Sequence, residues 1–174
     1  MSKKKRKGTG GSPGISKMRC PYCRSPVTLR SADGIYRENM RDTKLYVCAK
    51  YPVCDAYVRV QAGSKNIPLG SLANGQLRAL RREAHRHFDC IHQSGLMTKQ
   101  EAYVWLANIV AAPMAHAHIG QLREHYCQVV IKESKRFLEN NRDRIECKNA
   151  EARVRALARG GGHGEAKQRT ATTG

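Results

Sequence analysis

The chain of 174 residues has few acidic residues and few large aromatic side chains. It contains 14 Asp and Glu against 32 Lys and Arg, with one Trp and two Phe. A large core is therefore excluded, because aromatic side chains contribute much of the area that cores bury. The chain also offers few ligands for two-metal nuclease chemistry, because its carboxylates are scarce and scattered. The sequence predicts a small protein with a modest core.

Long hydrophobic runs are also missing. No stretch approaches the roughly 18 apolar residues of a membrane span. We expect no secretory leader, because the basic start is followed by Gly, Thr, Ser and Pro instead of an apolar run. Three of the seven cysteines, Cys90, Cys127 and Cys147, have no close cysteine neighbour in sequence. Free thiols of this kind are typical of a reducing, intracellular compartment.

The excess of basic residues gives a formal net charge of +18. Such a charge attracts polyanions, nucleic acid first and an acidic membrane surface second. Its distribution is uneven, since residues 1–19 hold seven basic and no acidic residues, and residues 134–174 hold ten basic and five acidic ones. This pattern predicts a compact middle with basic arms.

Two close pairs of cysteines carry the most specific signal. Cys20 and Cys23 are separated by two residues, and Cys48 and Cys54 by five, with 24 residues between the pairs. Both pairs lie in turn-rich sequence beside strands, which favours a shared zinc ion over the alternative that one pair is coincidental. Four thiolates fill the tetrahedral coordination and leave no position for water, so we expect one structural Zn²⁺. A module of about forty residues needs such a metal to be stable.

The expected fold is a small α+β protein, in which a four-cysteine zinc ribbon of short antiparallel strands precedes a three- to four-helix bundle. The termini are expected to be disordered and basic. The predicted segments in chain order are a disordered basic arm (1–17), the zinc ribbon (18–62), a linker (63–73), a helical bundle (74–140), a charged helix (141–159) and a disordered tail (160–174).

Periodic patterns predict the individual elements. Short β-branched and aromatic runs predict strands at 27–30, 44–47 and 56–60. Apolar residues at three- and four-residue steps predict helices over 74–92, 99–110 and 120–139. Thr98 and Glu101 have the spacing of a capping box at the second helix. The third helix is expected to bury Leu122, Tyr126, Val130 and Phe137. Residues 142–159 either extend it or form a separate helix.

Five of the seven tyrosines lie in the ribbon among arginines and lysines. Exposed rings stack on unpaired bases, and basic side chains neutralise phosphates. Tyr46 and Tyr57 lie on strands and are expected to serve the ribbon's own core, whereas Tyr22 and Tyr51 lie inside the cysteine turns. The predicted nucleic-acid contacts are Tyr22, Arg24, Arg30, Lys50, Tyr51 and Arg59 of the ribbon, Arg78, Arg81 and Arg82 on the exposed face of the first helix, and Lys3, Lys4, Lys5, Arg6 and Lys7 of the arm.

The ribbon sequence is similar to the C-terminal zinc ribbons of bacterial type IA topoisomerases. The similarity is carried by Cys20-Pro-Tyr-Cys23 and by Leu45-Tyr-Val-Cys48-Ala-Lys-Tyr-Pro-Val-Cys54. Those ribbons bind single-stranded DNA, so the resemblance implies the same for residues 20–60. Nothing in the chain resembles the topoisomerase catalytic domain.

A longer resemblance covers residues 18–132. It rests on Ile67-Pro-Leu-Gly-Ser-Leu-Ala-Asn-Gly-Gln-Leu-Arg, Glu83-Ala-His-Arg-His-Phe-Asp, Glu101-Ala-Tyr-Val-Trp-Leu and His118-Ile-Gly, in this order. The chain thereby resembles a zinc-finger-containing family of unknown function from phages and bacterial mobile elements. This context implies the cytoplasm of a bacterial cell or phage-infected host. In a eukaryotic protein, the basic run near the start would instead imply nuclear import.

Histidines offer a competing interpretation. His85 and His92 fall on one face of the first predicted helix with Asp89 between them, and His116 and His118 precede the third helix. These residues could form a second metal site or a nuclease centre, or they could be polar surface residues. A metal site needs ligands from several elements with supporting partners, which the sequence does not indicate. A helix-turn-helix is disfavoured too, because the 111–118 loop exceeds the usual turn.

The sequence therefore predicts a non-enzymatic nucleic-acid-binding protein, with single-stranded DNA as the favoured ligand and RNA left open. The alternative is a protein–protein adaptor that docks through its ribbon and bundle onto a replication, transcription or host factor, because fold does not fix function. An enzyme that uses the histidines is the third and weakest hypothesis.

Overall fold

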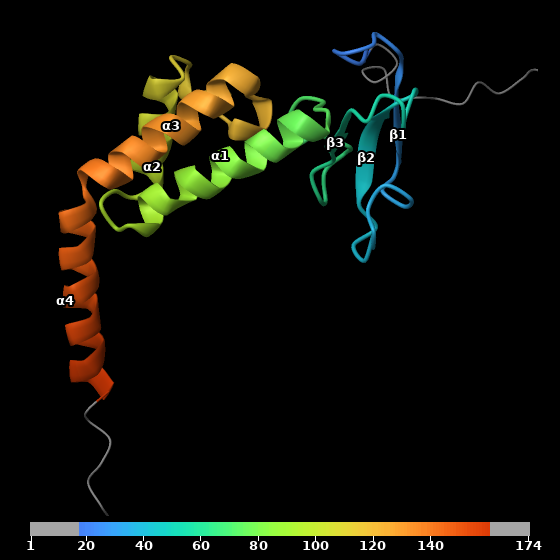
Figure 1. The fold of residues 1–174 in the computed structure, drawn as a ribbon. Coiled ribbons are helices and arrows are strands. Elements are labelled where there is room, and N and C mark those ends of the chain that lie inside the picture. The colour runs from blue at the N-terminus through green and yellow to red at the C-terminus, as the bar shows by residue number, and fades with distance from the viewer. Residues whose placement is uncertain (1–17, 161–174) are drawn as a thin grey trace, which may run out of the picture.

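The computed structural model describes residues 18–160, with side chains up to residue 156. Over this range the chain forms a three-stranded sheet followed by four α-helices and two short 3₁₀ turns (Figure 1). The prediction of a small α+β protein is confirmed. The predicted basic arm, with Lys3 to Lys7, and the tail beyond residue 160 lie outside the described residues.

The sheet is antiparallel, and its strand order follows the chain order. Its strands are β1 (Val27–Ser31), β2 (Lys44–Cys48) and β3 (Tyr57–Arg59). In the register, Cys48 of β2 lies opposite Val27 of β1, and Val47 lies opposite Tyr57 of β3. The three predicted strands are therefore confirmed, with β2 in the centre.

The two faces of the sheet have different partners, because successive strand residues point to opposite sides. On one face, Tyr46 and Cys48 pack with Val58 and with Cys20. On the other, Leu45 and Val47 are covered by tyrosines. We call this second side the tyrosine face; it consists of Leu45, Val47, Tyr36, Tyr51 and Tyr57. Since both faces are covered, β2 is buried from Leu45 to Cys48.

Three helices form the bundle, and its main contact is between α1 (Gly75–Gln93) and α3 (Glu124–Asn140). The helix α2 (Lys99–Ile109) packs against both α1 and α3. Asn74 caps α1 by accepting a hydrogen bond from the Leu77 amide at 2.9 Å. The apolar stripe of α1 is buried as its spacing predicts; its buried members are Leu77, Ala84, Phe88 and Ile91.

The third helix differs from its prediction in two respects. It begins at Glu124 instead of residue 120, because the short turns η1 (Met114–His116) and η2 (Ile119–Gln121) precede it. Tyr126, predicted to be buried, is 44% exposed. The reason is that the face of α3 against α1 follows Cys127, Val130, Ile131 and Ser134, and Tyr126 lies beside that stripe.

Residues beyond Asn141 form a separate helix, α4 (Arg142–Gly160), so the first of the two alternatives for this segment is wrong. The helix leaves the bundle at a steep angle to α3 (Figure 1). Lys148 connects α4 to the loop after α1 by donating a hydrogen bond to the Gly95 carbonyl at 2.7 Å. Within residues 18–160, none of the helices combines the length and apolar content that crossing a bilayer requires.

The segment predicted as a linker packs against the rest of the chain. Ala73 exchanges two backbone hydrogen bonds with Tyr57, at 3.1 and 3.2 Å. Gly70 lies so close to the Gly120 carbonyl that a Cβ atom at Gly70 would overlap it. Ser71 donates to the same carbonyl at 3.1 Å. These contacts join the segment before α1 to β3 and to the 3₁₀ turn around Gly120.

Candidate metal centre and nucleic-acid interface

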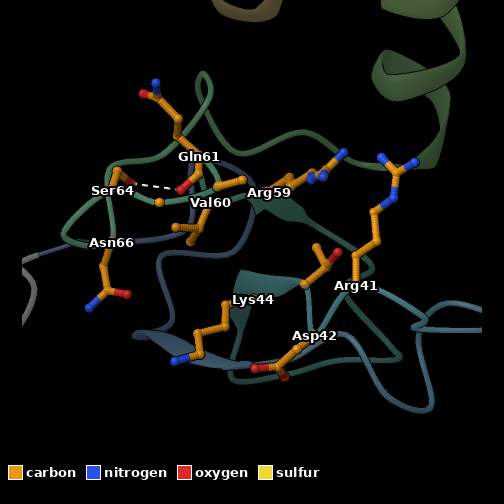
Figure 2. A pocket seen from close by; sticks show the side chains of 11 residues that line it. Arg41, Asp42, Lys44, Arg59, Val60, Gln61, Ser64 and Asn66 are labelled. Carbon is orange, nitrogen blue, oxygen red and sulfur yellow. Dashed lines mark hydrogen bonds between the residues drawn. The ribbon is translucent and has the colours of Figure 1, made fainter.

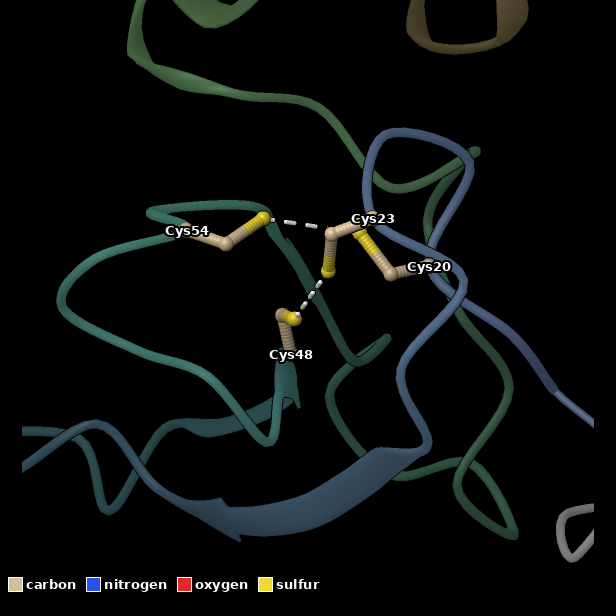
Figure 3. Close-up of side chains that lie close together, drawn as sticks. All are labelled: Cys20, Cys23, Cys48 and Cys54. Atoms are coloured by element: carbon tan, nitrogen blue, oxygen red, sulfur yellow. Dashed lines mark hydrogen bonds between the residues drawn. The ribbon is translucent and has the colours of Figure 1, made fainter.

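Four cysteine sulfurs meet at one end of the sheet (Figure 3). All four Sγ atoms lie within 4.8 Å of one another. The Sγ atoms of Cys20 and Cys54 are 3.6 Å apart, and those of Cys23 and Cys48 are 3.3 Å apart. Sulfurs around a tetrahedral zinc ion at about 2.3 Å are separated by about 3.8 Å. The arrangement therefore fits a four-thiolate zinc site.

Two tight turns present these sulfurs. In the first, the Arg24 amide donates to the Cys20 carbonyl at 3.0 Å, and Arg24 has a positive φ of 60°. In the second, the Cys54 amide donates to the Lys50 carbonyl at 3.0 Å. The turns meet because Cys48 ends β2 opposite Val27, which begins β1 just after the first turn.

The thiols differ in how readily they ionise. Burial raises the pKa of Cys48 to about 12 and also raises that of Cys54. A hydrogen bond with the Ser25 side chain lowers the pKa of Cys23 to about 6. Zinc binds the thiolate form, so loading the site must remove protons from the buried thiols. Four thiolates leave no position for a reactive water. The prediction of one structural zinc ion is confirmed.

The histidines do not join a comparable cluster. In the described part of the chain, the four cysteines are the only group of three or more His, Cys, Asp or Glu side chains close enough to share a metal ion. His85 and His118 line one cavity together with Tyr103. The ring of His118 is 6.4 Å from that of Tyr103, and burial lowers the pKa of His85. His116 is exposed on η1.

Three of the predicted nucleic-acid contacts gather on the tyrosine face. Arg30 of β1 and Arg59 of β3 lie on either side of Leu45 in the sheet register, and both are exposed. The Arg30 guanidinium lies 6.0 Å from the centre of the Tyr51 ring. Tyr51 itself is half-buried, because it covers the central strand. The face thus combines a partly exposed ring with two exposed cationic side chains.

Three further predicted contacts surround the cysteine turns. Arg24 and Lys50 are exposed, one on each turn. Tyr22 is 42% exposed, and its hydroxyl accepts a hydrogen bond from the Asn74 amide at 3.2 Å. Tyr22 therefore touches the beginning of α1 while part of its ring stays accessible. This contact gives Tyr22 a structural role that its sequence position did not reveal.

Two of the three predicted arginine contacts of α1 do not lie on its exposed face. Arg81 is only 8% exposed, so the prediction that it lies on the outer face of the helix is wrong. It donates to the Leu122 carbonyl at 2.9 Å and to the Ser71 carbonyl at 2.8 Å. Arg78 is also turned inward, with its guanidinium 3.7 Å from the centre of the Tyr57 ring. Arg82 is exposed as predicted.

The structure places two further basic residues, Arg41 and Lys44, beside the predicted contact Arg59. A polar pocket of about 300 Å³ beside the sheet is lined by Arg41, Lys44 and Arg59, with Asp42 as its acidic residue (Figure 2). Arg41 lies in the loop before β2, where no periodic pattern predicts its direction. The available signal was the interleaving of basic residues with the tyrosines of the ribbon.

A four-cysteine centre held by two turns at one end of a three-stranded antiparallel sheet defines a zinc-ribbon protein. The chain belongs to the zinc-finger-containing domain family, whose match covers residues 16–137. No curated protein and no solved structure matches the chain. The resemblance of the ribbon to topoisomerase ribbons, and an origin in phages or mobile elements, stay predictions.

Proposed function

We propose that this protein is a non-catalytic nucleic-acid-binding protein that prefers single-stranded DNA. The observation that carries the proposal is the tyrosine face, on which Tyr51 lies between the exposed Arg30 and the central strand and Arg59 follows on the opposite strand. No acidic residue occurs in any of the three strands. The surface is thus chemically suited to stacked bases and to phosphates.

The tyrosines of the ribbon differ in how well they can stack on bases. A base stacked on an aromatic side chain contributes about 1–3 kcal/mol, and every base offers a π face. Tyr57 is unsuitable for stacking, because Arg78 covers one side of its ring and Tyr36 lies against it, with ring centres 6.2 Å apart. Stacking therefore falls to Tyr22, at the zinc end, and to Tyr51. The Arg30 guanidinium is 6.0 Å from the centre of the Tyr51 ring instead of 3.7 Å, and its exposed side chain is free to move aside for a base.

Exposed cations supply the remaining attraction. Arg24, Lys50, Arg30 and Arg59 are exposed on the cysteine turns and on the two outer strands of the sheet. Phosphate contacts of this kind are independent of sequence and weaken with added salt, by a slope of about 0.7 in log K per contact for single strands. The proposal therefore requires a steep salt dependence together with a preference for unpaired bases.

The test compares binding of a labelled oligo-dT strand and a duplex of equal length to the zinc-loaded full chain, over a salt series. The variant Tyr51→Ala should bind the single strand at least about fivefold more weakly. Tyr126→Ala is the matched control, because Tyr126 is an exposed tyrosine on α3, outside the ribbon. Equal affinities of both variants, or a flat salt response of the wild-type protein, would contradict the proposal.

One observation favours the adaptor function as a second candidate. Val53 is 94% exposed in the second cysteine turn, where an apolar side chain could contact a partner protein. Retention of a defined protein on the immobilised chain after nuclease treatment, and its loss with Val53→Asp, would support an adaptor. Retention that disappears with nuclease would instead support nucleic-acid binding.

A further inference from the structure

A cleft lies where the sheet meets α1. Its volume is about 240 Å³, and its walls include Tyr36, Tyr57, Arg59, Arg78, Arg81 and Arg82. Arg59 comes from β3, and the other three arginines come from the first turns of α1. Four arginines from two elements therefore line one small space.

The cleft has a large excess of positive charge. Among the described residues, the only ion pair of these four arginines joins Arg78 to Asp55, at 3.1 Å. Arg81 is buried, yet its donors contact neutral groups only, the Leu122 carbonyl and the carbonyl and hydroxyl of Ser71. Burial lowers the pKa of Arg81, and this effect exceeds the opposing ones of Cys127, Tyr22 and Glu124.

An uncompensated guanidinium in a buried position is costly, so an anion placed in the cleft would stabilise it. Arginine suits phosphate in particular, because its planar fork can donate two parallel hydrogen bonds to two phosphate oxygens. Arg81 contributes fixed positive charge to the wall, whereas the charge of Arg78 is balanced by Asp55. Arg59 and Arg82 are exposed, and no ion pair within residues 18–156 occupies either of them.

The size of the cleft limits what it can hold. Pockets that enclose whole small-molecule ligands have volumes of about 300–1,000 Å³. This cleft is smaller, and the ring of Tyr57 in its wall is already covered by Arg78 at 3.7 Å. A single anionic group fits these constraints better than a base or a complete cofactor. Arg59 also lines the neighbouring pocket with Arg41 and Lys44, so a linear polyanion could continue past the cleft (Figure 2).

We propose that the cleft between β3 and α1 binds one phosphodiester group of a single nucleic-acid strand that lies across the tyrosine face. This inference rests on the proposed function and extends the interface from the ribbon onto the helical bundle. Arg59 connects the two parts, because it belongs to the sheet register beside Leu45 and also lines the cleft.

The test uses the cleft variant Arg82→Ala, which leaves the structural Arg78 and Arg81 and the sheet residue Arg59 intact. The matched control is Arg86→Ala, which removes the same charge from an exposed arginine of the same helix outside the cleft. Binding of a labelled oligo-dT strand is measured over a salt series. The cleft variant should bind about tenfold more weakly than the control, and its salt slope should be smaller by about 0.7 for each phosphate that is no longer neutralised.

Zinc content and amide spectra of both variants should equal those of the wild-type protein. A second arm titrates inorganic phosphate and follows the side-chain Nε–H signal of Arg81, which every variant retains. Saturable shifts are expected in the wild-type protein and should be abolished in the cleft variant. Absence of such shifts from the wild-type protein would overturn the inference.

The outcomes separate the two proposals. Equal strand affinity of the cleft variant and the control, with weaker binding by Tyr51→Ala, would overturn the cleft and leave the proposed function standing. Phosphate shifts without any effect on strand affinity would identify free phosphate as the ligand and would also overturn it. Failure of the wild-type protein to bind any strand would refute the proposed function and this extension of it together.

Discussion

Arg78 and Asp55 join the helical bundle to the zinc ribbon, with Arg78 Nη2 3.1 Å from Asp55 Oδ2. The same carboxylate oxygen accepts a hydrogen bond from the Gly75 amide at 2.7 Å, at the beginning of α1. A negative charge is favourable there, because the helix dipole is positive at that end. Asp55 directly follows the zinc ligand Cys54 in sequence. The metal turn and the first helix are thereby fixed to each other.

Replacing Asp55 tests this connection. Asp55→Ala removes acceptors of Arg78 and Gly75, and we expect unfolding to become easier by about 1–2 kcal/mol, a value reduced for the partial exposure of the pair. Chemical denaturation of the zinc-loaded protein measures the change. Glu38→Ala, which removes one negative charge from an exposed loop, should change stability by less than about 0.5 kcal/mol. Equal effects of both substitutions would contradict a specific role for Asp55.

Removal of zinc should unfold the ribbon selectively. Its core surrounds the cysteines and is separate from the core of the helices. A chelator or the variant Cys48→Ser should therefore abolish amide dispersion for residues 18–62, with helical signals of α1 and α3 retained. Cys90→Ser and Cys147→Ser are the controls, and they should keep one zinc per chain by elemental analysis. An ordered ribbon without metal would disprove this expectation.

Arg81 and Arg82 are neighbours in sequence, but their substitutions should have different effects on stability. Arg81→Ala leaves the carbonyls of Leu122 and Ser71 without their charged donor, so a loss of about 2–4 kcal/mol is expected. Arg82→Ala removes the same charge from an exposed position and should be nearly neutral. Thermal unfolding of both variants with equal zinc content gives the comparison. Similar stabilities would show that burial of Arg81 is not important for the fold.

The capping box of α2 should impose a pH dependence. Glu101 accepts hydrogen bonds from the Thr98 amide and hydroxyl, and these bonds hold the pKa of Glu101 below its usual range. A lowered pKa in the folded state means that the contribution is complete above the ordinary pKa of glutamate and is lost as the pH falls through the lowered value.

The variant Thr98→Ala removes the cap of α2, and we expect it to cost about 1 kcal/mol at neutral pH. The difference from wild type should shrink in acid, when Glu101 is protonated. Gln100→Ala, in the same first turn, is the control and should show no such trend. Hydrogen exchange of the α2 amides, followed over pH, is the measurement. A difference that stays constant down to low pH would rule out a contribution from the Glu101 carboxylate.

The zinc site could be predicted from sequence because its chemistry is local. Each pair of cysteines lies within one tight turn, and a tetrahedral four-thiolate site requires the two turns to meet. The strands and the apolar stripe of α1 could be predicted for a similar reason. The period at which apolar residues recur in the sequence reflects burial of one face of the element. The start of α3 was missed because η1 and η2 contain apolar residues, such as Ile119, that continue the apparent helical pattern.

The composition of the ribbon indicated a candidate interface, but the sequence did not show where its residues lie in space. Tyrosines and arginines were concentrated in the ribbon, yet their spacing did not show that Tyr57 is covered by Arg78 or that Tyr22 contacts the amide of Asn74. Those contacts join residues that are 21 and 52 positions apart in sequence. Sequence periodicity reports the partners within one element, and it carries no information on which elements approach each other.

The sequence by itself determined the four ligands, the antiparallel strands that carry them and the excess of basic charge, because these depend on residue type and on short spacing. Only the tertiary structure decided where the basic groups act. Packing of α1 against η2 and against the segment that contains Ser71 buried Arg81 and left Arg82 exposed, although the two are adjacent in the chain. The physical reason is that burial of a helix face is set by the neighbour it meets, and that neighbour comes from a distant part of the chain.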